Sequence, residues 1–470
     1  MLQKYQTMKY NSDKPIDILY KKQKIFFDSQ VTIPNTFRIK KLKALRKEIN
    51  RREQDIYSAL NKDLRKSEFE SMTSETVLVE KEIKKMIKML PLWNRPIRAK
   101  SSLINFPSRD YLIPEPYGNT LIISPWNYPF QLAVTPLVGA IAAGNTVVLK
   151  PSEFAPYTGE LIKEIIEKVF DEGHVAVLEG DGSVASDLLQ KKWDYIMFTG
   201  STSIGKIVAK AAAEHLTPTT LELGGKSPCV IDKTPPIGIT AKRLVWGKFL
   251  NCGQTCIAPD YILVHEDIKE KLIQKVIHQI EKAFGKNQQN SEDYGRIAHK
   301  NHFNRLKKSL ENQNVIYGGQ MAEKELFFGP TLVDNPPLIS ELMQEEIFGP
   351  ILPIISYKEE EEIHKILEKR ERPLAFYVFS KRKKFIDQLF KRYSFGGGVA
   401  NDSIIHFAND NLPFGGVGHS GMGAYHGKFS FKNFSHYKPV IKRAYWFDIP
   451  GRYAPYPKSL SLLKLLLKNL

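Results

Sequence analysis

The apolar positions of the chain follow two different spacings, and the change between them divides the sequence. Between residues 36 and 95, apolar residues such as Leu42, Leu45 and Ile49 recur at intervals of three or four. This spacing places them on one face of a helix, so the stretch predicts two helices with a charged face toward water. Residues 100–118 are strand-like and contain prolines, which indicates an extended ribbon that leaves the main body.

After residue 118, short apolar runs alternate with helical segments. A helix is expected to start at Thr135-Pro136, because proline suits the first turn, and to stop at Gly144, because glycine suits the end of a helix. Other helices are expected at 159–170 and 204–216, and strands at 121–124, 145–150, 176–178 and 195–199. Such alternation predicts a parallel, doubly wound sheet.

A second alternating region begins near residue 227. Its helices are expected around 238–250 and 267–284, and its strands around 261–264, 351–356 and 374–379. The prediction is an α/β fold with two doubly wound parallel-sheet domains and a small β arm that includes 100–118. We place a Rossmann-like domain at 1–225, a second domain at 226–415, and a return segment with a bridging strand and tail helix at 416–470. A ligand site is expected in the cleft between the two domains.

Composition agrees with a large globular protein. The chain has 470 residues, of which 42% are hydrophobic and 25% charged, enough for two or three domains with substantial cores. Its three cysteines, Cys229, Cys252 and Cys256, form no CxxC pair, so neither a disulfide framework nor a zinc site is indicated. No secretory signal or convincing membrane span is evident. The cytoplasm is the expected location.

The net charge of +17 raises the question of nucleic acid as a partner. The basic residues are dispersed and no aromatic-basic RNA-binding signature is present, so we interpret them as solvated faces and predict no nucleic-acid site. The positive field could still attract anionic cofactors or anionic membranes. The apolar tail at 460–470 is too short to cross a bilayer. A helix that packs on protein is favoured there, with weak peripheral membrane contact as the alternative.

Two segments carry candidate chemistry. Cys256 lies in the turn-prone run Asn-Cys-Gly-Gln-Thr-Cys-Ile-Ala-Pro, where a loop can present a nucleophilic thiolate to a cleft. Glu222 lies upstream between two leucines, just before a glycine pair. A partly dry pocket at the end of a strand would raise the pKa of this carboxyl and make it a suitable general base.

The stretch 198–206, Phe-Thr-Gly-Ser-Thr-Ser-Ile-Gly-Lys, predicts a turn from a strand into a helix. Its backbone N–H groups and the following helix N-terminus would seat a diphosphate. Gly200 and Gly205 have the spacing GxxxxG, which differs from the usual GxGxxG dinucleotide pattern and is weak by itself. Lys150 and Glu153 follow an apolar strand at its carboxyl end, where such sheets bind ligands.

These segments resemble signatures of the aldehyde dehydrogenase superfamily, in which a LELGGK stretch carries a base and a GQxC stretch a nucleophile. Four further stretches are similar to the family's motifs: 124–130, which contains Pro-Trp-Asn, and 150–153, 198–206 and 345–350. The stretch from Pro413 to Gly427 resembles the class 3 branch, which includes the fatty aldehyde dehydrogenases.

The resemblance implies NAD(P)-dependent oxidation of aldehydes, medium- to long-chain aliphatic or aromatic ones, to carboxylic acids. Cys256 would form a thiohemiacetal and then a thioester, Asn127 and a backbone N–H would hold the oxyanion, and Glu222 would activate water. The implied cofactor residues are Trp126, Lys150, Glu153, Gly200, Ser201, Gly205, Glu346 and Phe348. A carboxylate at Glu153 would repel a 2′-phosphate whereas Lys150 would attract one, so NAD is favoured and NADP stays open.

The resemblance also implies a homodimer, formed through the ribbon at 100–118 and a segment near 425–440. The alternatives are a cysteine-dependent ester or thioester hydrolase, an acylating relative that uses coenzyme A, and a non-catalytic structural descendant. Cys252 is interpreted as a packing residue, with a resolving thiol as the alternative. Lys226 is expected to support the Glu222 segment. The spacing of His406, His419 and His426 fits no metal site, and none is predicted.

Overall fold

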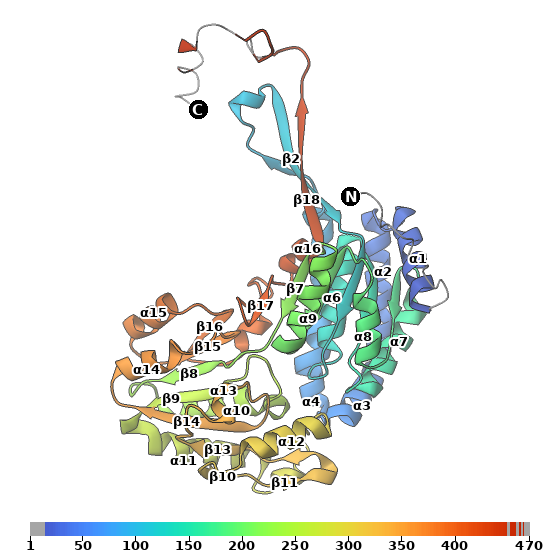
Figure 1. The fold of residues 1–470 in the computed structure, drawn as a ribbon. Coiled ribbons are helices and arrows are strands. Elements are labelled where there is room, and N and C mark those ends of the chain that lie inside the picture. Colours follow the sequence, from blue (N-terminus) through green and yellow to red (C-terminus); the bar gives the residue numbers. More distant parts are fainter. Residues whose placement is uncertain (1–14, 449–451, 457–459, 462–463, 465–470) are drawn as a thin grey trace, which may run out of the picture.

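The computed structural model describes residues 15–448, 452–456, 460, 461 and 464 of the chain. In this part of the chain, two mainly parallel sheets carry helices on both faces, and a thin β ribbon projects from the body (Figure 1). The expected fold class, two doubly wound α/β domains with a small β arm, is therefore confirmed.

The first sheet has the strand order β17-β7-β6-β3-β4-β5, and β17 alone pairs antiparallel. Its strands are β3 (Asn119–Ile123), β4 (Thr146–Lys150), β5 (Val175–Val177), β6 (Tyr195–Thr199), β7 (Thr219–Glu222) and β17 (Gly421–Met422). Neighbouring strand residues point to opposite faces, so Leu121 and Ile122 belong to different apolar clusters. The helices that cover this domain are α1 (Pro15–Asp28), α6 (Gln131–Ala143), α7 (Pro156–Val169), α8 (Gly182–Leu189), α9 (Thr202–Glu214) and α16 (Lys428–Asn433).

The segment 36–95 contains more helices than the two that its periodicity predicts. They are α2 (Asn35–Arg51), α3 (Glu53–Leu64), α4 (Glu68–Ser71), a π-helical turn (Met72–Thr76) and α5 (Val77–Trp93). The breaks fall at Arg52 and at Arg65, which takes a left-handed conformation with φ 53°. Neither break contains glycine or proline, so the sequence gives no local signal for it.

Helix α6 begins at Gln131, so the predicted start at Thr135-Pro136 is wrong, and Pro136 lies inside the helix. A carboxylate from another segment explains the earlier start, because Glu75 Oε2 accepts hydrogen bonds from Phe130 N at 2.9 Å and Gln131 N at 3.1 Å. Gly144 caps the end with φ 101°, as expected.

The second sheet has the order β10-β13-β14-β9-β8-β15-β16, and only β10 pairs antiparallel. Its strands are β8 (Pro228–Ile231), β9 (Tyr261–His265), β10 (Val315–Tyr317), β13 (Thr331–Asp334), β14 (Ile351–Tyr357), β15 (Ala375–Phe379) and β16 (Gly397–Ala400). The associated helices are α10 (Ile237–Phe249), α11 (Glu266–Phe284), α12 (Lys300–Ser309), α13 (Glu341–Gln344), α14 (Glu360–Leu367) and α15 (Lys383–Arg392), and a small hairpin joins β11 (Met321–Ala322) to β12 (Phe327–Phe328). The predicted helices and strands of this region all occur.

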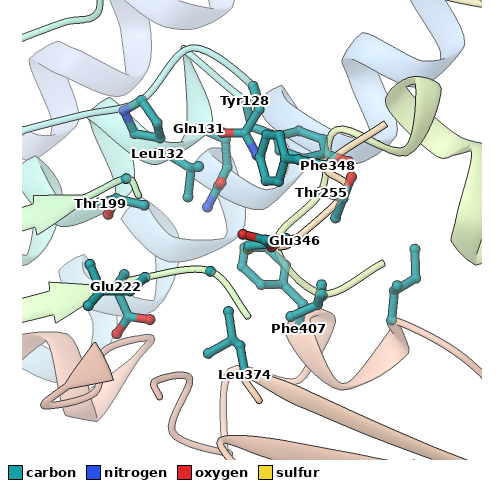
Figure 2. Close-up of a pocket in the computed structure, with 18 of the residues that line it drawn as sticks. Tyr128, Gln131, Leu132, Thr199, Glu222, Thr255, Glu346, Phe348, Leu374 and Phe407 are labelled. Carbon is teal, nitrogen blue, oxygen red and sulfur yellow. Dashed lines mark hydrogen bonds between the residues drawn. The ribbon is translucent and has the colours of Figure 1, made fainter. Parts of the chain in front are cut away.

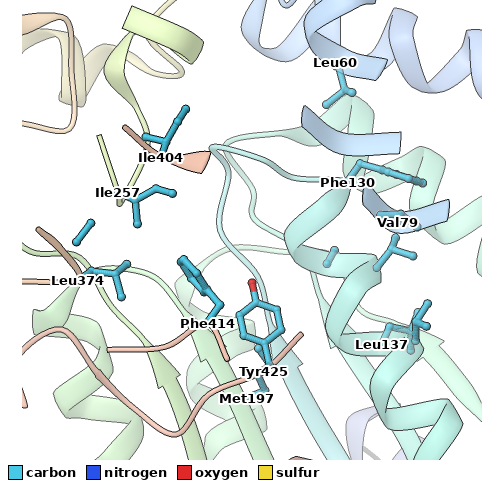
Figure 3. Close-up of a cluster of buried hydrophobic side chains, with 14 of the residues drawn as sticks. Leu60, Val79, Phe130, Leu137, Met197, Ile257, Leu374, Ile404, Phe414 and Tyr425 are labelled. Carbon is cyan, nitrogen blue, oxygen red and sulfur yellow. The ribbon is translucent and has the colours of Figure 1, made fainter. Parts of the chain in front are cut away.

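The return segment after β16 packs against both domains. Figure 3 shows its buried residues Phe414 and Tyr425 near Leu374 of the second domain and Met197 of the first. In addition, β17 pairs with β7, and Leu223 N donates to Ser420 O at 3.1 Å. The late part of the chain therefore fixes the end of β7, where Glu222 lies.

The arm consists of β1 (Ile97–Ala99), β2 (Ser108–Pro116) and β18 (Ser435–Arg443), all antiparallel (Figure 1). The ribbon expected at 100–118 contains β2, and the bridging strand expected within 416–470 is β18, which pairs with β2. The tail helix expected at 460–470 lies outside the described residues except at three positions. No helix in the described part of the chain is long and apolar enough to cross a membrane.

Candidate active site

A cavity of about 760 Å³ is lined by residues of both domains. Among the predicted site residues, eight line it: Trp126, Asn127, Gly200, Ser201, Glu222, Cys256, Glu346 and Phe348. Lys150, Glu153 and Gly205 do not. Figure 2 shows Glu222 and Glu346 projecting into this space from two different segments. The structure thus brings the candidate nucleophile, base and amide donor into one enclosed site.

A tight turn after α10 presents Cys256 to the cavity. Asn251 and Cys252 both have φ 53°, and Gly253 has φ 72°, so the chain reverses through consecutive left-handed residues. A Cβ atom at Gly253 would lie 2.4 Å from the carbonyl oxygen of Gly349, so only glycine fits there. Gln254 then locks the turn, because its side chain donates to Asn251 O and Arg296 O.

The thiol of Cys256 is half-buried. Burial raises its pKa, and the negative charges of Glu346 and then Glu222 raise it further. Hydrogen bonds from the backbone N–H groups of Cys256 and Ile257 act in the opposite direction. These two N–H groups therefore lie beside the sulfur, where they stabilise a thiolate and are close to the place where the oxygen of an attacked carbonyl becomes an oxyanion.

Glu222 is the last residue of β7 and is only 2% exposed. Neither carboxyl oxygen has a hydrogen-bond partner, and burial raises its pKa well above the ordinary 4.5. The dry pocket and the raised pKa expected from the sequence are therefore present. The backbone of Glu222 also accepts from Gly200 N at 3.0 Å, which joins the base to the glycine turn.

The loop after β3 holds Asn127, which is 2% exposed. Its Nδ2 atom donates to Gln254 O at 3.0 Å, the one acceptor that the described residues give this nitrogen, so its second N–H remains for a ligand. The loop is anchored by Lys66, whose Nζ donates to Asn127 O at 3.0 Å and to Glu75 at 2.5 Å. Both charged side chains of this ion pair are 0% exposed.

Sequence reasoning missed Lys66 and Glu75. They lie in a charged run that looks like a solvated helix face, and no local pattern separates them from their exposed neighbours. Tyr128, Thr255 and Tyr425 also line the cavity without having been predicted. The Tyr128 and Thr255 hydroxyls lie 2.6 Å apart, which ties the Asn127 loop to the Cys256 loop.

Glu346 is held by contacts around its backbone. Lys226 Nζ donates to Asp260 Oδ2 at 2.6 Å, Leu342 O at 2.7 Å and Glu345 O at 2.9 Å. Lys226 thus fixes the Glu346 segment, and the expectation that it supports the Glu222 segment is wrong, because its side chain turns toward the second domain. Burial raises the pKa of Glu346 to about 8, with the charge of Asp260 adding to the effect.

Glycine is required opposite this carboxylate, since a Cβ at Gly224 would lie 1.8 Å from Glu346 Oε2. Phe348 follows with φ 52°, and His302 Nε2 donates to its carbonyl at 2.7 Å. Burial lowers the pKa of His302 to about 3, so this ring is neutral. The Trp126 and Phe348 rings pack edge to face with centroids 5.3 Å apart.

The remaining cofactor candidates lie at the carboxyl edge of the first sheet. Lys150, 3% exposed at the end of β4, donates to Glu153 Oε2 at 2.8 Å. Ser201 caps α9 by accepting from Ile204 N at 3.4 Å, and the first N–H groups of this helix face the turn. Gly205 packs against Leu223, the residue that follows β7, because a Cβ there would lie 2.5 Å from Leu223 Cδ2. A helix N-terminus behind a glycine turn fits a dinucleotide diphosphate.

Two other expectations concern cysteine and histidine. Cys252 is 0% exposed and packs with Tyr294, Ile297 and Phe303, which agrees with its interpretation as a packing residue. Burial raises the pKa of its thiol. Within the described ranges, no cluster of three or more His, Cys, Asp or Glu side chains could hold a metal ion.

Comparison with known proteins agrees with this geometry. The model of the aldehyde dehydrogenase family matches residues 4–440. The 4,4′-diaponeurosporen-aldehyde dehydrogenase of Staphylococcus aureus is 44% identical over 448 residues, which cover 95% of this chain and 98% of that protein. Mouse (Mus musculus) aldehyde dehydrogenase family 3 member A2 is 45% identical over 415 residues, which cover 88% of this chain and 86% of that protein.

A solved structure of Staphylococcus aureus AldH in a substrate-bound state superimposes with a TM-score of 0.95 at 42% identity. The match covers 97% of this chain and all of that one, 100%. The resemblance to the class 3 branch seen in the sequence is thereby confirmed. The chain belongs to the aldehyde dehydrogenase family and is an oxidoreductase that oxidises aldehydes with NAD or NADP.

Proposed function

We propose that Cys256 is the nucleophile of this reaction, Glu222 the base that hydrolyses the thioester, and Asn127 an oxyanion donor. The observation that carries the proposal is that all three line one cavity beside the N-terminus of α9. A buried carboxylate without hydrogen-bond partners is free to take a proton, which a structural carboxylate is not.

In the first step the Cys256 thiol loses its proton to solvent water, and the sulfur attacks the aldehyde carbon. The carbonyl oxygen becomes an oxyanion, which the Asn127 side-chain N–H and a backbone N–H beside Cys256 stabilise. One such donor typically lowers the free energy of the transition state by about 3 kcal/mol. Neutral donors suit this role because they add no competing titration.

The cofactor, when bound, accepts the hydride that leaves this carbon, and a thioester to Cys256 remains. Glu222 then removes a proton from water as the water attacks the thioester carbonyl. The carbon–sulfur bond breaks, and the carboxylic acid and the free thiol are the products. Asn127 stabilises the second oxyanion in the same position as the first.

We propose NAD as the preferred cofactor. Glu153 accepts a hydrogen bond from Lys150, so the two charges compensate each other. In the family resemblance these two residues bind the adenosine ribose, where the Glu153 carboxylate would repel a 2′-phosphate. Rates measured with NAD and NADP at equal concentrations test this preference.

We propose medium- to long-chain aliphatic or aromatic aldehydes as substrates. The cavity has mainly apolar walls, to which Leu132, Trp246, Leu250, Ile404, Phe407 and Phe414 contribute. Each methylene moved from water to such a wall contributes about 0.8 kcal/mol. In a chain-length series, kcat/KM should therefore rise with each added carbon until the chain outgrows the cavity.

The mechanism is tested by rapid-mixing measurements of NADH formation. Glu222→Gln should release one equivalent of NADH per site and then nearly stop, because the thioester forms but is not hydrolysed. Cys256→Ala should release none, while the control Glu270→Gln, on the exposed face of α11 and away from the cavity, should behave as wild type. A cysteine hydrolase, the main alternative, would cleave esters without any NADH. Full turnover by Cys256→Ala would contradict the mechanism.

We further propose that the chain forms a homodimer through its arm and works in the cytoplasm. Support for the dimer comes from apolar residues exposed on the arm, including Ile97 (44% exposed), Phe106 (51%) and Ile441 (54%). Exposed apolar surface of this kind is typical of association sites. The free thiols of all three cysteines suit a reducing compartment.

A further inference from the structure

A second cavity, of about 330 Å³, opens at the amino ends of β8, β9 and β15. Its walls include Tyr261, Arg370, Arg372 and Tyr393, and it shares no lining residue with the active-site cavity. Lys226 also lines it, and this lysine holds the segment that carries Glu346. The second cavity is thus separate from the reaction site but connected to it through one side chain.

Basic side chains outnumber acidic ones around this cavity. The four basic residues are Lys226, Arg370, Arg372 and Arg392, and the two acidic residues are Glu368 and Glu371. Both carboxylates are already paired, Glu368 with Arg392 at 2.5 Å and Glu371 with His419 at 2.7 Å. The walls therefore keep an excess of positive charge.

Two of the arginines retain unused hydrogen-bond donors. Arg370 donates from one terminal nitrogen to Leu338 O at 3.3 Å, whereas its Nε atom is buried without a partner. Arg372 forms no ion pair with any residue in the described part of the chain. Lys226, in contrast, already donates to three oxygens and has no free N–H.

A buried hydroxyl gives the independent sign of a missing ligand. Tyr261 is 0% exposed, and its Oη atom has no hydrogen-bond partner. The charges nearest this hydroxyl are those of Arg370 and Asp260, followed by Tyr393. The Asp260 carboxylate is paired with Lys226 at 2.6 Å, so the cation of Arg370 is left to face a ligand. An unpaired buried hydroxyl is costly, and proteins rarely keep one unless a ligand, ion or water completes it.

We propose that this cavity binds a small molecule with an oxyanion group, a phosphate or a carboxylate. One oxygen would accept from the Tyr261 hydroxyl, and the others from the unused N–H groups of Arg370 and Arg372. Arginine is suited to such groups because its planar fork can donate two parallel hydrogen bonds.

The test is isothermal titration calorimetry of the full chain with inorganic phosphate, and separately with acetate. Saturating NAD, without aldehyde, fills the diphosphate site at α9, and sodium chloride keeps the ionic strength constant. Wild type should bind at one saturable site. Tyr261→Phe and Arg372→Gln should each weaken binding about tenfold, since each loses a hydrogen bond to a charged group. Arg98→Gln, which removes an exposed charge from the arm, should change nothing.

The same variants also show whether a loss of binding reflects a loss of folding. Tyr261→Phe removes a hydroxyl that is unpaired without ligand, so its unfolding temperature in phosphate-free buffer should be no lower than that of wild type. Binding of both anions identifies a site for either group, and binding of phosphate alone identifies a phosphate site. No saturable binding to wild type, or an equal loss in Arg98→Gln, would overturn the proposal.

Discussion

At the scale of single residues, two carboxylates that face the same thiol differ in what holds them. Glu346 receives a hydrogen bond from Gly225 N and lies near Lys226 and Arg305, whereas the carboxyl oxygens of Glu222 have no hydrogen-bond partner among the described residues. A carboxylate already compensated by donors and cations is a weaker base than one that has none. This contrast is why we assign the hydrolytic step to Glu222.

The pH dependence of turnover follows from this assignment. Glu222 acts as a base only when ionised, and burial raises its pKa well above 4.5. Lowering the pH through this raised pKa should therefore protonate the base and reduce kcat, so the acid limb of the profile should lie well above the ordinary carboxyl range.

A matched variant identifies the group responsible for that limb. Glu222→Gln should lower kcat by about 10²- to 10⁴-fold and remove the acid limb from what activity remains. The kcat–pH profiles of wild type and Glu222→Gln show whether Glu222 is the group that titrates in the acid limb. An unchanged acid limb in Glu222→Gln would assign the titration to another group.

The site was more predictable from sequence than the contacts that support it. Glu222 and Gly200 follow strand ends and Cys256 lies in a glycine-containing turn, but these runs became specific only through their resemblance to family motifs. Lys66 and Glu75 were not found, because burial of a charge depends on what distant segments cover it. No local spacing encodes such a contact.

At the scale of elements, the π-helical turn between α4 and α5 carries the carboxylate that starts α6. Glu75 is fully buried between Lys66 and the first N–H groups of α6. Removing one partner of a buried ion pair leaves an uncompensated charge, which typically costs about 3–5 kcal/mol. Glu75→Gln should therefore lower the free energy of unfolding strongly and displace the Asn127 loop.

Urea denaturation checks this expectation, with Glu68→Gln as the control because Glu68 is exposed on α4. The control should differ from wild type by less than about 0.5 kcal/mol. A Glu75→Gln protein as stable as the control would show that the ion pair does not hold the loop.

Helix α9 offers a second test at this scale. Alanine at Gly205 would place its Cβ 2.5 Å from Leu223 Cδ2, so either the buried Leu223 side chain or the helix must shift. A shift of the helix would displace the diphosphate seat at its N-terminus, and KM for NAD should then rise by about tenfold or more. Gly182→Ala on α8, where a Cβ meets nothing within 4 Å, should leave KM unchanged. Steady-state kinetics with varied NAD compare the two.

Strand positions were predicted better than helix positions, for a physical reason. The predicted strands, such as β3, β4 and β15, are short apolar runs buried along their whole length, which a local pattern can show. The more exposed strands β10 and β16 were not predicted. The start of α6 was mispredicted because the side chain of Glu75, which lies 56 residues before Gln131, satisfies its first N–H groups. Helix ends that depend on residues far away in the sequence cannot be predicted from local sequence patterns.

At the scale of the whole molecule, the dimer that we propose would form through the arm. Ile441 lies on β18 opposite Asp110 and is 54% exposed. Ile441→Lys would pair with Asp110 within the chain but bring a charge into an apolar contact between chains. Sedimentation velocity should therefore show a monomer for this variant and a dimer for wild type.

The control for this prediction is Ile339→Lys, which changes an apolar residue that is 88% exposed outside the arm. It should sediment as wild type does. If both variants remain dimeric, the copies associate through another surface.

The pairing of β17 with β7 affects when the enzyme becomes active during its synthesis. Glu222 lies near the middle of the chain, but the strand that flanks it is made of Gly421 and Met422, and Tyr425 lies in the same cavity wall. During synthesis, Cys256 is added to the chain long before the strand Gly421–Met422, which pairs with the end of β7 at Glu222. Synthesis from the N-terminus therefore leaves the nascent chain inactive until nearly all of it has left the ribosome, and activity begins with the last strands to fold.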